Sequence, residues 1–264
     1  MSIKDRYGPW AVVAGGSEGV GLELALLLGS HGVHVVLVAR KRERLEHAAG
    51  RVRDHGVEVR TVAVDLSEPD AVAEVVRATA DVEVGLLALN AGANSHGGPF
   101  TERDLTALDR IVRVNVGAVL GLTHHYAATM RERARGGVLL VGSLAGYVGT
   151  STEAVYAGAK AFSRVFAEGL WAEIAPQGVD VLELVLGVTR TPAMERAGLD
   201  LDLPGLTVSD PADVAREGLE RLPHGPVHVV RAHEALLPSR LSPDRARVVS
   251  TTDRFLRSLV PSQA

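Results

Sequence analysis

Short runs of β-branched and other apolar residues alternate with helical stretches through the first half of this chain, and this alternation is the strongest constraint on its fold. The expected strands are residues 10–14, 34–39, 58–64 and 84–89. The helices expected between them are residues 20–31, 42–55 and 69–80. Ser67 is the predicted cap of the third helix. The pattern is typical of a parallel sheet that helices cover on both faces.

The second half of the chain continues the pattern with longer helices. The helical stretches are residues 104–135, 152–176 and 211–222, and the strands are residues 137–141, 180–185 and 227–230. We therefore predict one α/β domain of about seven strands over residues 1–264, because α/β folds of this length commonly stay undivided. Residues 232–264 form a helical extension in this prediction. Its apolar stripe is expected to pack, although a basic amphipathic helix on a membrane surface is the alternative.

Composition excludes several classes of function. The 264 residues carry a formal net charge of −4 with interspersed charges, so no basic stripe indicates a nucleic-acid partner. The absence of cysteine excludes disulfides and thiolate metal sites, and the adjacent His124 and His125 point in different directions, so no metal site is expected. No apolar run reaches transmembrane length and the first residues do not form a signal peptide. These features favour a cytoplasmic protein without an integral membrane partner.

A glycine-rich turn follows the first expected strand directly. Its spacing is Gly-x-x-x-Gly-x-Gly, and the residues expected to contact a ligand there are Gly15, Ser17, Gly19, Val20 and Gly21. Such a turn places bare backbone amides and the positive end of a helix where a pyrophosphate can bind. The alternative is a tight turn that needs glycine for backbone reasons alone.

The residue after the second strand bears on which dinucleotide binds. Arg40 stands there instead of the carboxylate usual in NAD sites, and a guanidinium suits a 2′-phosphate, so NADP(H) is predicted and NAD(H) is the alternative. Glu18 weakens this case, and Glu43 and Glu46 could instead pair with the neighbouring arginines. Asp65 could accept a hydrogen bond from an adenine amino group, or could simply stabilise a turn.

Tyr156 and Lys160 lie four residues apart, thirteen residues after Ser143. Four tyrosines and three lysines predict only about 0.05 such pairs by chance. On a helix the two side chains share a face, so the ammonium is expected to favour the ionised phenol and to make it a usable acid or base. The alternative is an exposed pair on a solvated helix face.

From residue 10 to about residue 231 these motifs resemble the short-chain dehydrogenase/reductase family, and the resemblance implies a Rossmann-type, doubly wound sheet. Asn115, Ser143, Tyr156 and Lys160 match the catalytic tetrad of that family. Asn90, Ala91 and Gly92 resemble the end of its Asn-Asn-Ala-Gly motif. The residues Gly187, Thr189 and Thr191 resemble the segment that holds the nicotinamide, and Leu66 is expected to contact the cofactor.

The resemblance implies an NAD(P)-dependent oxidoreductase that interconverts a carbonyl and a secondary alcohol. Tyr156 would be the acid or base, Ser143 would bind the substrate oxygen, Lys160 would stabilise the tyrosinate and reach the ribose, and Asn115 would support a proton relay. The implied assembly is a homodimer or homotetramer, and the substrate a small-molecule carbonyl or alcohol. The alternatives are a catalytically silent dinucleotide-binding regulator and a non-redox cyclase or dehydratase.

Some residues depart from the family pattern or lie outside its motifs. Ala14, Leu89 and Leu186 replace a threonine, an asparagine and a proline. Residues 192–206 are expected to form a mobile lid, since they mix glycine, proline and acids with apolar residues. Candidate substrate contacts outside the motifs are Ser95, His96, Tyr147, Met194 and Leu199. The extension after Arg231 is expected to cover the pocket or a neighbouring subunit.

Overall fold

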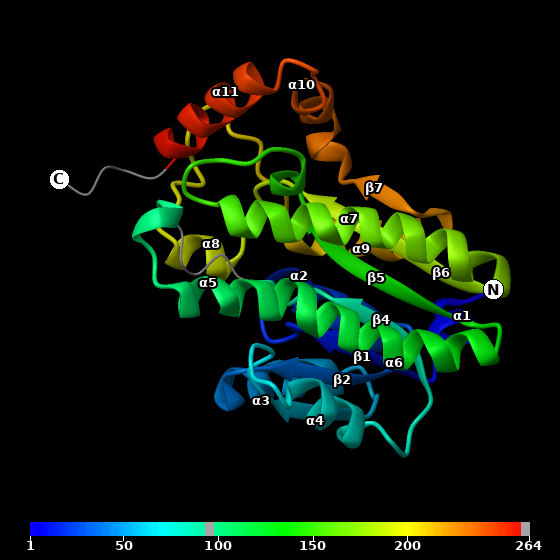
Figure 1. The fold of residues 1–264 in the computed structure, drawn as a ribbon. Coiled ribbons are helices and arrows are strands. Elements are labelled where there is room, and N and C mark those ends of the chain that lie inside the picture. Colours follow the sequence, from blue (N-terminus) through cyan, green and yellow to red (C-terminus); the bar gives the residue numbers. More distant parts are fainter. Residues whose placement is uncertain (93–97, 260–264) are drawn as a thin grey trace.

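Seven strands form one parallel sheet in the computed structural model, which describes residues 1–92 and 98–259 (Figure 1). Their order across the sheet is β3-β2-β1-β4-β5-β6-β7. The strands are β1 (Trp10–Ala14), β2 (His34–Ala39), β3 (Val59–Ala63), β4 (Val84–Leu89), β5 (Gly136–Ser143), β6 (Val179–Leu186) and β7 (Val227–Val229). The predicted doubly wound sheet is confirmed. Its strand order reverses between β1 and β4, where ligands of such sheets bind beyond the carboxyl ends of the strands.

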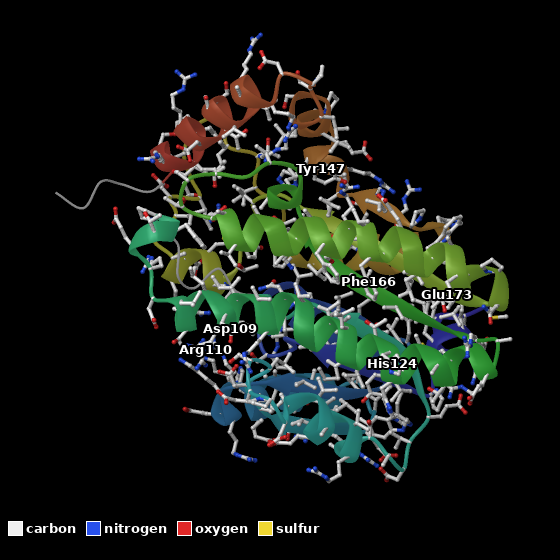
Figure 2. All side chains as sticks on the ribbon, viewed as in Figure 1. Asp109, Arg110, His124, Tyr147, Phe166 and Glu173 are labelled. Atoms are coloured by element: carbon white, nitrogen blue, oxygen red, sulfur yellow. The ribbon has the colours of Figure 1, made fainter. Side chains whose placement is uncertain are left out.

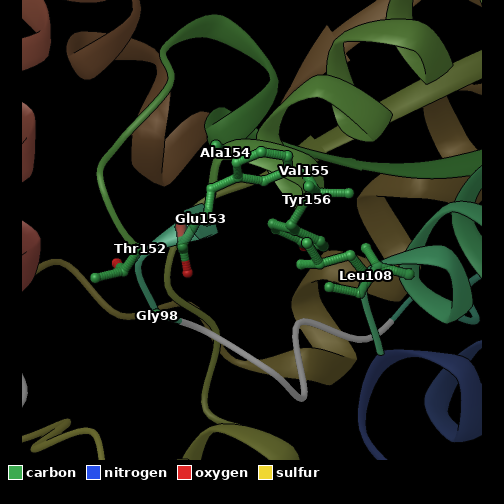
Figure 3. Close-up of a pocket in the computed structure, with 9 residues that line it drawn as sticks. Gly98, Leu108, Thr152, Glu153, Ala154, Val155 and Tyr156 are labelled. Carbon is green, nitrogen blue, oxygen red and sulfur yellow. The ribbon is translucent and has the colours of Figure 1, made fainter. Parts of the chain in front are cut away.

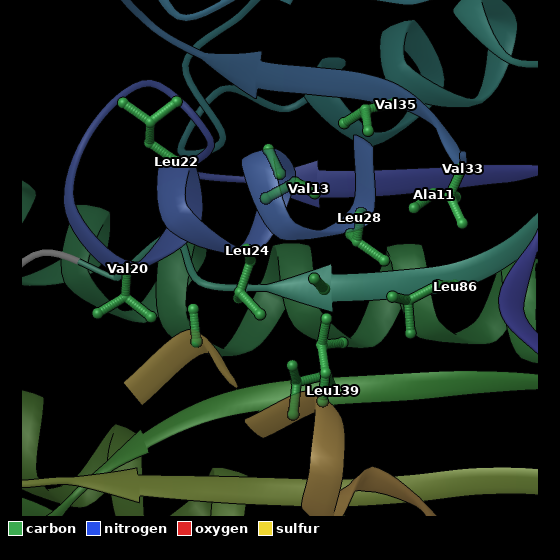
Figure 4. Close-up of a cluster of buried hydrophobic side chains, with 14 of the residues drawn as sticks. Ala11, Val13, Val20, Leu22, Leu24, Leu28, Val33, Val35, Leu86 and Leu139 are labelled. Carbon is green, nitrogen blue, oxygen red and sulfur yellow. The ribbon is translucent and has the colours of Figure 1, made fainter. Parts of the chain in front are cut away.

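Helices cover both faces of the sheet because the strands bury side chains in both directions. One face packs against α2 (Gly19–Ser30), α3 (Arg42–Arg53) and α9 (Pro211–Arg221). The other packs against α4 (Ala71–Ala78), α6 (Ala118–Glu132) and α7 (Ala154–Ile174). In β1, Ala11 and Val13 belong to the first core and Val12 and Ala14 to the second. Figure 4 shows Val13, Leu24 and Leu28 within the first core.

The long helix predicted over residues 104–135 is interrupted, so the prediction of one continuous helix is wrong. α5 (Leu105–Val112) runs into a π-helical turn, η2 (Arg113–Gly117), and α6 follows. A π turn accommodates one additional residue, and such turns are frequent at functional sites. Asn115 lies within it, and its Nδ2 donates to the Ile111 carbonyl over 3.0 Å.

Two further local predictions differ from the structure. Ser67 does not cap α4, which begins at Ala71. The Ser67 amide and hydroxyl instead donate to Asp65 over 3.0 and 2.7 Å. A short helix, α1 (Ile3–Tyr7), was not predicted. It is anchored to the start of β6, where the Tyr7 hydroxyl donates to Asp180 over 2.8 Å.

The remaining elements lie around the sheet. They are η1 (Phe100–Glu102), η3 (Leu144–Tyr147), η4 (Ala175–Gln177), α8 (Pro192–Arg196), η5 (Leu222–His224), η6 (Arg231–Leu236), α10 (Leu237–Arg240) and α11 (Arg245–Ser258). Beyond Val230 the chain forms η6, α10 and α11, with a non-helical connection at residues 241–244. Within residues 1–92 and 98–259, none of the helices is long and apolar enough to span a membrane.

Candidate active site

The glycine-rich turn between β1 and α2 leaves no room for side chains at its glycines. Gly15 and Gly19 have φ angles of +83° and +56°, which residues with a Cβ rarely adopt. A Cβ at Gly21 would lie 2.2 Å from the Gly15 carbonyl oxygen. Ser17 is partly exposed in the turn, and Val20 is buried in the core below it. The backbone at the start of α2 is therefore bare, as a pyrophosphate site requires.

The end of β4 is fastened to this turn. The Asn90 side chain donates to the Gly15 carbonyl over 2.9 Å. The Ala14 carbonyl accepts from the amides of Asn90 and Ala91 over 3.0 and 2.7 Å. The substitutions at Ala14 and Leu89 therefore leave the two turns joined, because these hydrogen bonds use the backbone and Asn90.

Arg40 projects from the carboxyl end of β2. Its side chain is 61% exposed, and its guanidinium lies 3.9 Å from the Asp65 carboxylate. In the described part of the chain no ion pair joins Arg40 to Glu43 or Glu46, the two acids that offered an alternative. An ion pair at this separation contributes little when the arginine is exposed, so Arg40 remains available to an anionic ligand.

Glu18, the acid in the glycine-rich turn, is paired with two arginines. Arg44 donates to it over 3.0 Å, and Arg196 of α8 makes two hydrogen bonds to the same carboxylate. Partial burial acts to raise the pKa of Glu18, but Arg196 and Arg44 outweigh it and hold the pKa below its usual value. The negative charge that argued against NADP is therefore compensated within the chain.

Asp65 has partners of its own at the end of β3. Besides Ser67 it accepts from Arg110, at 2.8 Å, and partial burial is outweighed by these contacts so that its pKa is lowered. Arg110 belongs to α5 and is labelled in Figure 2. Asp65 thus stabilises a turn, and its contact with adenine stays a prediction. Leu66, the next residue, is buried.

Tyr156 lies in the first turn of α7 and lines a small open pocket with a cavity volume of about 10 Å³ (Figure 3). The other lining residues are Gly98, Phe100, Leu108, Ile111, Thr152, Glu153, Ala154 and Val155. Ser143 ends β5, and its side chain acts to lower the pKa of the nearby Tyr156 phenol. Its Oγ also accepts from the Ala145 amide over 3.1 Å, which fixes the hydroxyl at the strand end.

Lys160 and Asn115 meet beneath Gly92. Lys160 is 7% exposed, and its ammonium donates to the Val141 carbonyl over 2.9 Å. A Cβ at Gly92 would lie 2.9 Å from the Lys160 Nζ and 2.8 Å from the Asn115 Oδ1. That Oδ1 is buried and has no hydrogen-bond partner among the described residues. The four residues predicted from the tetrad therefore converge, with Gly92 supplying the room.

The acidity of the phenol differs from the expectation. Burial raises the pKa of Tyr156 to about 12, the hydrogen bond with Ser143 acts to lower it, and Glu153 acts to raise it. The expected lowering of this pKa is not seen, because burial is the largest effect and outweighs those that oppose it. The Lys160 Nζ lies over the ring, 5.8 Å from its centroid, and donates to Val141 instead. Tyr156 therefore keeps its proton at neutral pH.

A carboxylate that the sequence analysis missed lies behind Lys160. Glu183 of β6 is 1% exposed, and burial raises its pKa to about 7 although Lys160 acts to lower it. Lys160 in turn has its pKa lowered to about 8 by burial, and Glu183 opposes this shift. The sequence did contain a signal for this residue, because Glu183 is an acid inside a predicted strand of a parallel sheet, and both faces of such a sheet are normally apolar.

The segment after β6 is brought next to the glycine-rich turn. Thr191 contacts Gly19, because a Cβ there would lie 2.9 Å from the Thr191 methyl group. Thr189 is buried, and its hydroxyl donates to the Gly187 carbonyl over 3.3 Å. The ring of the buried His233 packs against Gly187 and leaves no space for a side chain.

The predicted lid begins with α8, which Arg196 connects to Glu18 of the glycine-rich turn. Met194 is exposed and Leu199 is half-buried in this segment. Arg190 donates to Asp202 over 2.7 Å. Mobility of the lid and substrate contacts of Met194, Leu199 and Tyr147 stay predictions, whereas Ser95 and His96 lie outside the described residues.

The C-terminal extension lies over its own chain, next to the loop that joins β5 to α7. Arg240 donates to the Leu144 carbonyl over 3.2 Å, and Arg245 donates to the Tyr147 carbonyl over 2.8 Å. Asp253 of α11 accepts from the amide and the hydroxyl of Ser151, at 2.7 and 2.6 Å. The extension therefore holds the loop between Ser143 and Tyr156.

The chain is similar to proteins of known sequence and structure. The family described as short chain dehydrogenase matches residues 9–201. A 7beta-hydroxysteroid dehydrogenase of Clostridium sardiniense is 33% identical over 223 residues, which are 84% of this chain and 85% of the relative. A very-long-chain 3-oxoacyl-CoA reductase of Podospora anserina is 34% identical over 81% of this chain and 65% of its own length.

Solved structures agree. The structure of a 7beta-hydroxysteroid dehydrogenase studied for its stereoselectivity superposes with a TM-score of 0.87 at 27% identity, and covers 95% of this chain and 99% of its own. A short-chain dehydrogenase from Sphingobium yanoikuyae in complex with NADPH gives 0.79 at 27% identity, over 97% and 98%. The chain therefore belongs to the short-chain dehydrogenase/reductase family of oxidoreductases.

Proposed function

We propose that this protein interconverts a ketone and a secondary alcohol with NADP(H), and that Tyr156 is the acid and base. The observation that carries the proposal is the position of the Tyr156 phenol, which lines an open pocket close to Ser143 at the end of β5. Lys160 and Asn115 also support the proposal, because both are buried and their polar atoms lie close to Gly92.

The bound dinucleotide supplies the hydride, so the chain has to manage one proton and one developing negative charge. In reduction, the Tyr156 hydroxyl gives its proton to the carbonyl oxygen of the substrate as hydride arrives at the carbon. Ser143 donates a hydrogen bond to the same oxygen as it becomes negative. The Lys160 ammonium offsets the charge left on the phenolate. The pKa of Tyr156, raised to about 12, keeps that proton in place at neutral pH and suits reduction.

The pocket supports a substrate with an apolar skeleton. Phe100, Leu108, Ile111 and Val155 contribute apolar side chains to the lining beside Tyr156. Two relatives are named for a hydroxysteroid and for a 3-oxoacyl thioester, both of which carry a carbonyl or alcohol on a largely apolar body. We therefore propose a bulky apolar ketone as the substrate class.

The test of this function is the loss of NADPH absorbance with steroid ketones, 3-oxoacyl thioesters and bulky aryl ketones. We expect oxidation of NADPH matched by one equivalent of secondary alcohol for at least one of these classes. Binding of NADPH without turnover of any of them would favour the silent regulator. Turnover without net oxidation of NADPH would favour a cyclase or dehydratase.

Arg40 supports the preference for NADP(H), and its removal gives a direct test. Arg40→Ala is expected to weaken NADPH binding by about 10- to 100-fold, because a hydrogen bond between charged groups contributes about 1.5–3 kcal/mol. NADH binding should stay unchanged, since NADH has no 2′-phosphate. Fluorescence titration with each dinucleotide measures the effect.

Arg51→Ala, near the C-terminal end of α3, is the matched control for Arg40→Ala, because it removes the same charge at a position away from the carboxyl end of β2. Arg51 is exposed and lies 3.9 Å from Glu23. We expect it to bind both dinucleotides like the wild type. An equal loss of NADH and NADPH affinity in Arg40→Ala, or tighter binding of NADH by the wild type, would refute the assignment of Arg40.

A further proposal is that the chain forms a homodimer or homotetramer through α5, α6 and α7. Their exposed side chains include large apolar residues, namely Leu105, Val112, Leu120, Val165 and Trp171. Apolar side chains gathered on neighbouring helices are typical of surfaces that associate. Sedimentation of the full chain tests this proposal, and a monomer at micromolar concentration would refute it.

A further inference from the structure

Glu183 is an acid in a position that normally costs stability. It lies on β6 opposite Leu140 of β5 and Val227 of β7, so strands flank it on both sides. A Cβ at Gly142 would lie 2.5 Å from the Glu183 Oε1, so the carboxylate rests directly against the backbone of β5. Neither oxygen makes a hydrogen bond of normal geometry with a described residue, although the nearby Ser163 hydroxyl favours the charged form. A buried carboxylate so poorly paired is expensive.

The charged and titratable groups that face Glu183 come from two elements. From α7, Lys160 and Arg164 act to lower its pKa and Glu168 acts to raise it. From η3, Tyr147 has a pKa that burial raises most and the negative charge of Glu183 raises further. The Tyr147 phenol therefore interacts electrostatically with this carboxylate. Lys160 and Arg164 are one helical turn apart on the same face of α7, so Glu183 faces two cations.

Lys160 is the member of this cluster that belongs to the candidate active site. Its ammonium binds the Val141 carbonyl, and Gly142, the next residue of β5, contacts the Glu183 carboxylate. Burial lowers the pKa of Lys160 to about 8, and the attraction of Glu183 is the effect that opposes it. The two groups therefore lie on the same face of the sheet, next to consecutive residues of β5, without forming an ion pair within 4.0 Å among the described residues.

We propose that Glu183 is a positioning residue, which keeps Lys160 protonated and held on β5 beside Tyr156. The proposal rests on the function proposed above for the part that concerns catalysis. Its electrostatic part concerns two buried side chains and can be tested without turnover. The carboxylate compensates the cost of burying the Lys160 charge, and Lys160 then stabilises the phenolate that Tyr156 becomes after proton transfer.

The direction of the expected change follows from charge. Lys160 loses its proton as the pH rises through its pKa, and the negative charge of Glu183 delays that loss. Glu183→Gln keeps the shape of the side chain and removes the charge, so Lys160 should deprotonate at lower pH. An opposite charge in a buried site shifts a pKa by about 1 unit or more, so we expect a change of about 1 pH unit.

The direct test is a titration of lysine side chains labelled with carbon-13 at Cε, followed by NMR. The chain has only three lysines, and Lys4 and Lys41 serve as internal references. In the wild type Lys160 should titrate near pH 8. In Glu183→Gln its titration should move to lower pH by about 1 unit. An unchanged Lys160 titration would overturn the proposal whether or not the enzyme is active.

The kinetic test is the pH profile of kcat/KM for ketone reduction. In Glu183→Gln the basic limb should move to lower pH by about 1 unit, with activity near pH 6 retained. Glu173→Gln is the matched control, since Glu173 is an exposed glutamate near the end of α7, 13 residues and therefore about 20 Å along the helix from Lys160. Figure 2 labels Glu173. A uniform loss of activity at all pH values, with a lowered melting temperature, would show a purely structural role and refute the proposal. A shifted Lys160 titration with no ketone reduced by the wild type would instead refute the proposed function alone.

Discussion

Replacing Tyr156 with phenylalanine is expected to lower kcat/KM for ketone reduction by about 1,000-fold. The substitution removes one oxygen from a side chain that lines the pocket and leaves the ring in place. General acid catalysis is worth about 100- to 10,000-fold, and Ser143 alone would remain to stabilise the developing charge. NADPH binding should change by less than about threefold, because the ring keeps its packing on α7. Stopped-flow absorbance at the NADPH band with the best ketone measures the rate.

Tyr126→Phe provides the matched control for this experiment. Tyr126 is buried on α6, and its hydroxyl pairs with the Thr79 hydroxyl over 2.7 Å, away from the pocket. Losing that hydrogen bond should cost about 1 kcal/mol of unfolding free energy and leave kcat/KM unchanged. Wild-type turnover by Tyr156→Phe would disprove the assigned proton donor.

Gly21→Ala is expected to weaken NADPH binding by at least about tenfold and to destabilise the fold by about 2 kcal/mol. The added Cβ would lie 2.2 Å from the Gly15 carbonyl oxygen and 2.6 Å from the Asn90 Nδ2. Both atoms belong to the hydrogen bond that joins the glycine-rich turn to β4, so the turn must open. In a chain of this length 2 kcal/mol corresponds to a fall of about 4–8 °C in melting temperature.

The control for Gly21→Ala is Gly50→Ala in α3. No atom lies within 4 Å of a Cβ placed at Gly50, and the residue is inside a helix. Alanine there should raise the unfolding free energy by about 0.5–1 kcal/mol and leave dinucleotide binding unaffected. Scanning calorimetry and fluorescence titration measure both quantities. A Gly21→Ala protein with the wild-type melting temperature and affinity would contradict the role given to the turn.

Features that depend on local pattern could be predicted from the sequence. The strands of the sheet, the glycine-rich turn and the helix carrying Tyr156 and Lys160 follow from residue type and spacing over a few positions. The prediction that Asn115, Ser143, Tyr156 and Lys160 form one site depended on the family resemblance. The residues that hold each of them in place, such as Gly92 and Val141, could not be named, because they are close only after the sheet forms.

Features that depend on register or distant contacts escaped prediction. Glu183 is an acid inside an expected strand, but its partners and its place in the interior follow only from the pairing of β6 with β5 and β7. The π turn at Asn115 leaves no mark in the hydrophobic pattern, which runs through it without a break. The wrong expectation for the pKa of Tyr156 has the same origin. Spacing put Lys160 on the correct face, but burial, which spacing does not measure, determined the result.

The contact between Asp253 and Ser151 joins positions 102 residues apart and fixes the loop that precedes Tyr156. Because Asp253 and Arg245 grip this loop through its backbone and through Ser151, they constrain its path without touching the proton-transfer groups. Engineering of substrate scope can use this arrangement. Random mutagenesis confined to the pocket lining would overlook α11, where altered loop geometry could admit larger ketones while the chemistry stays intact.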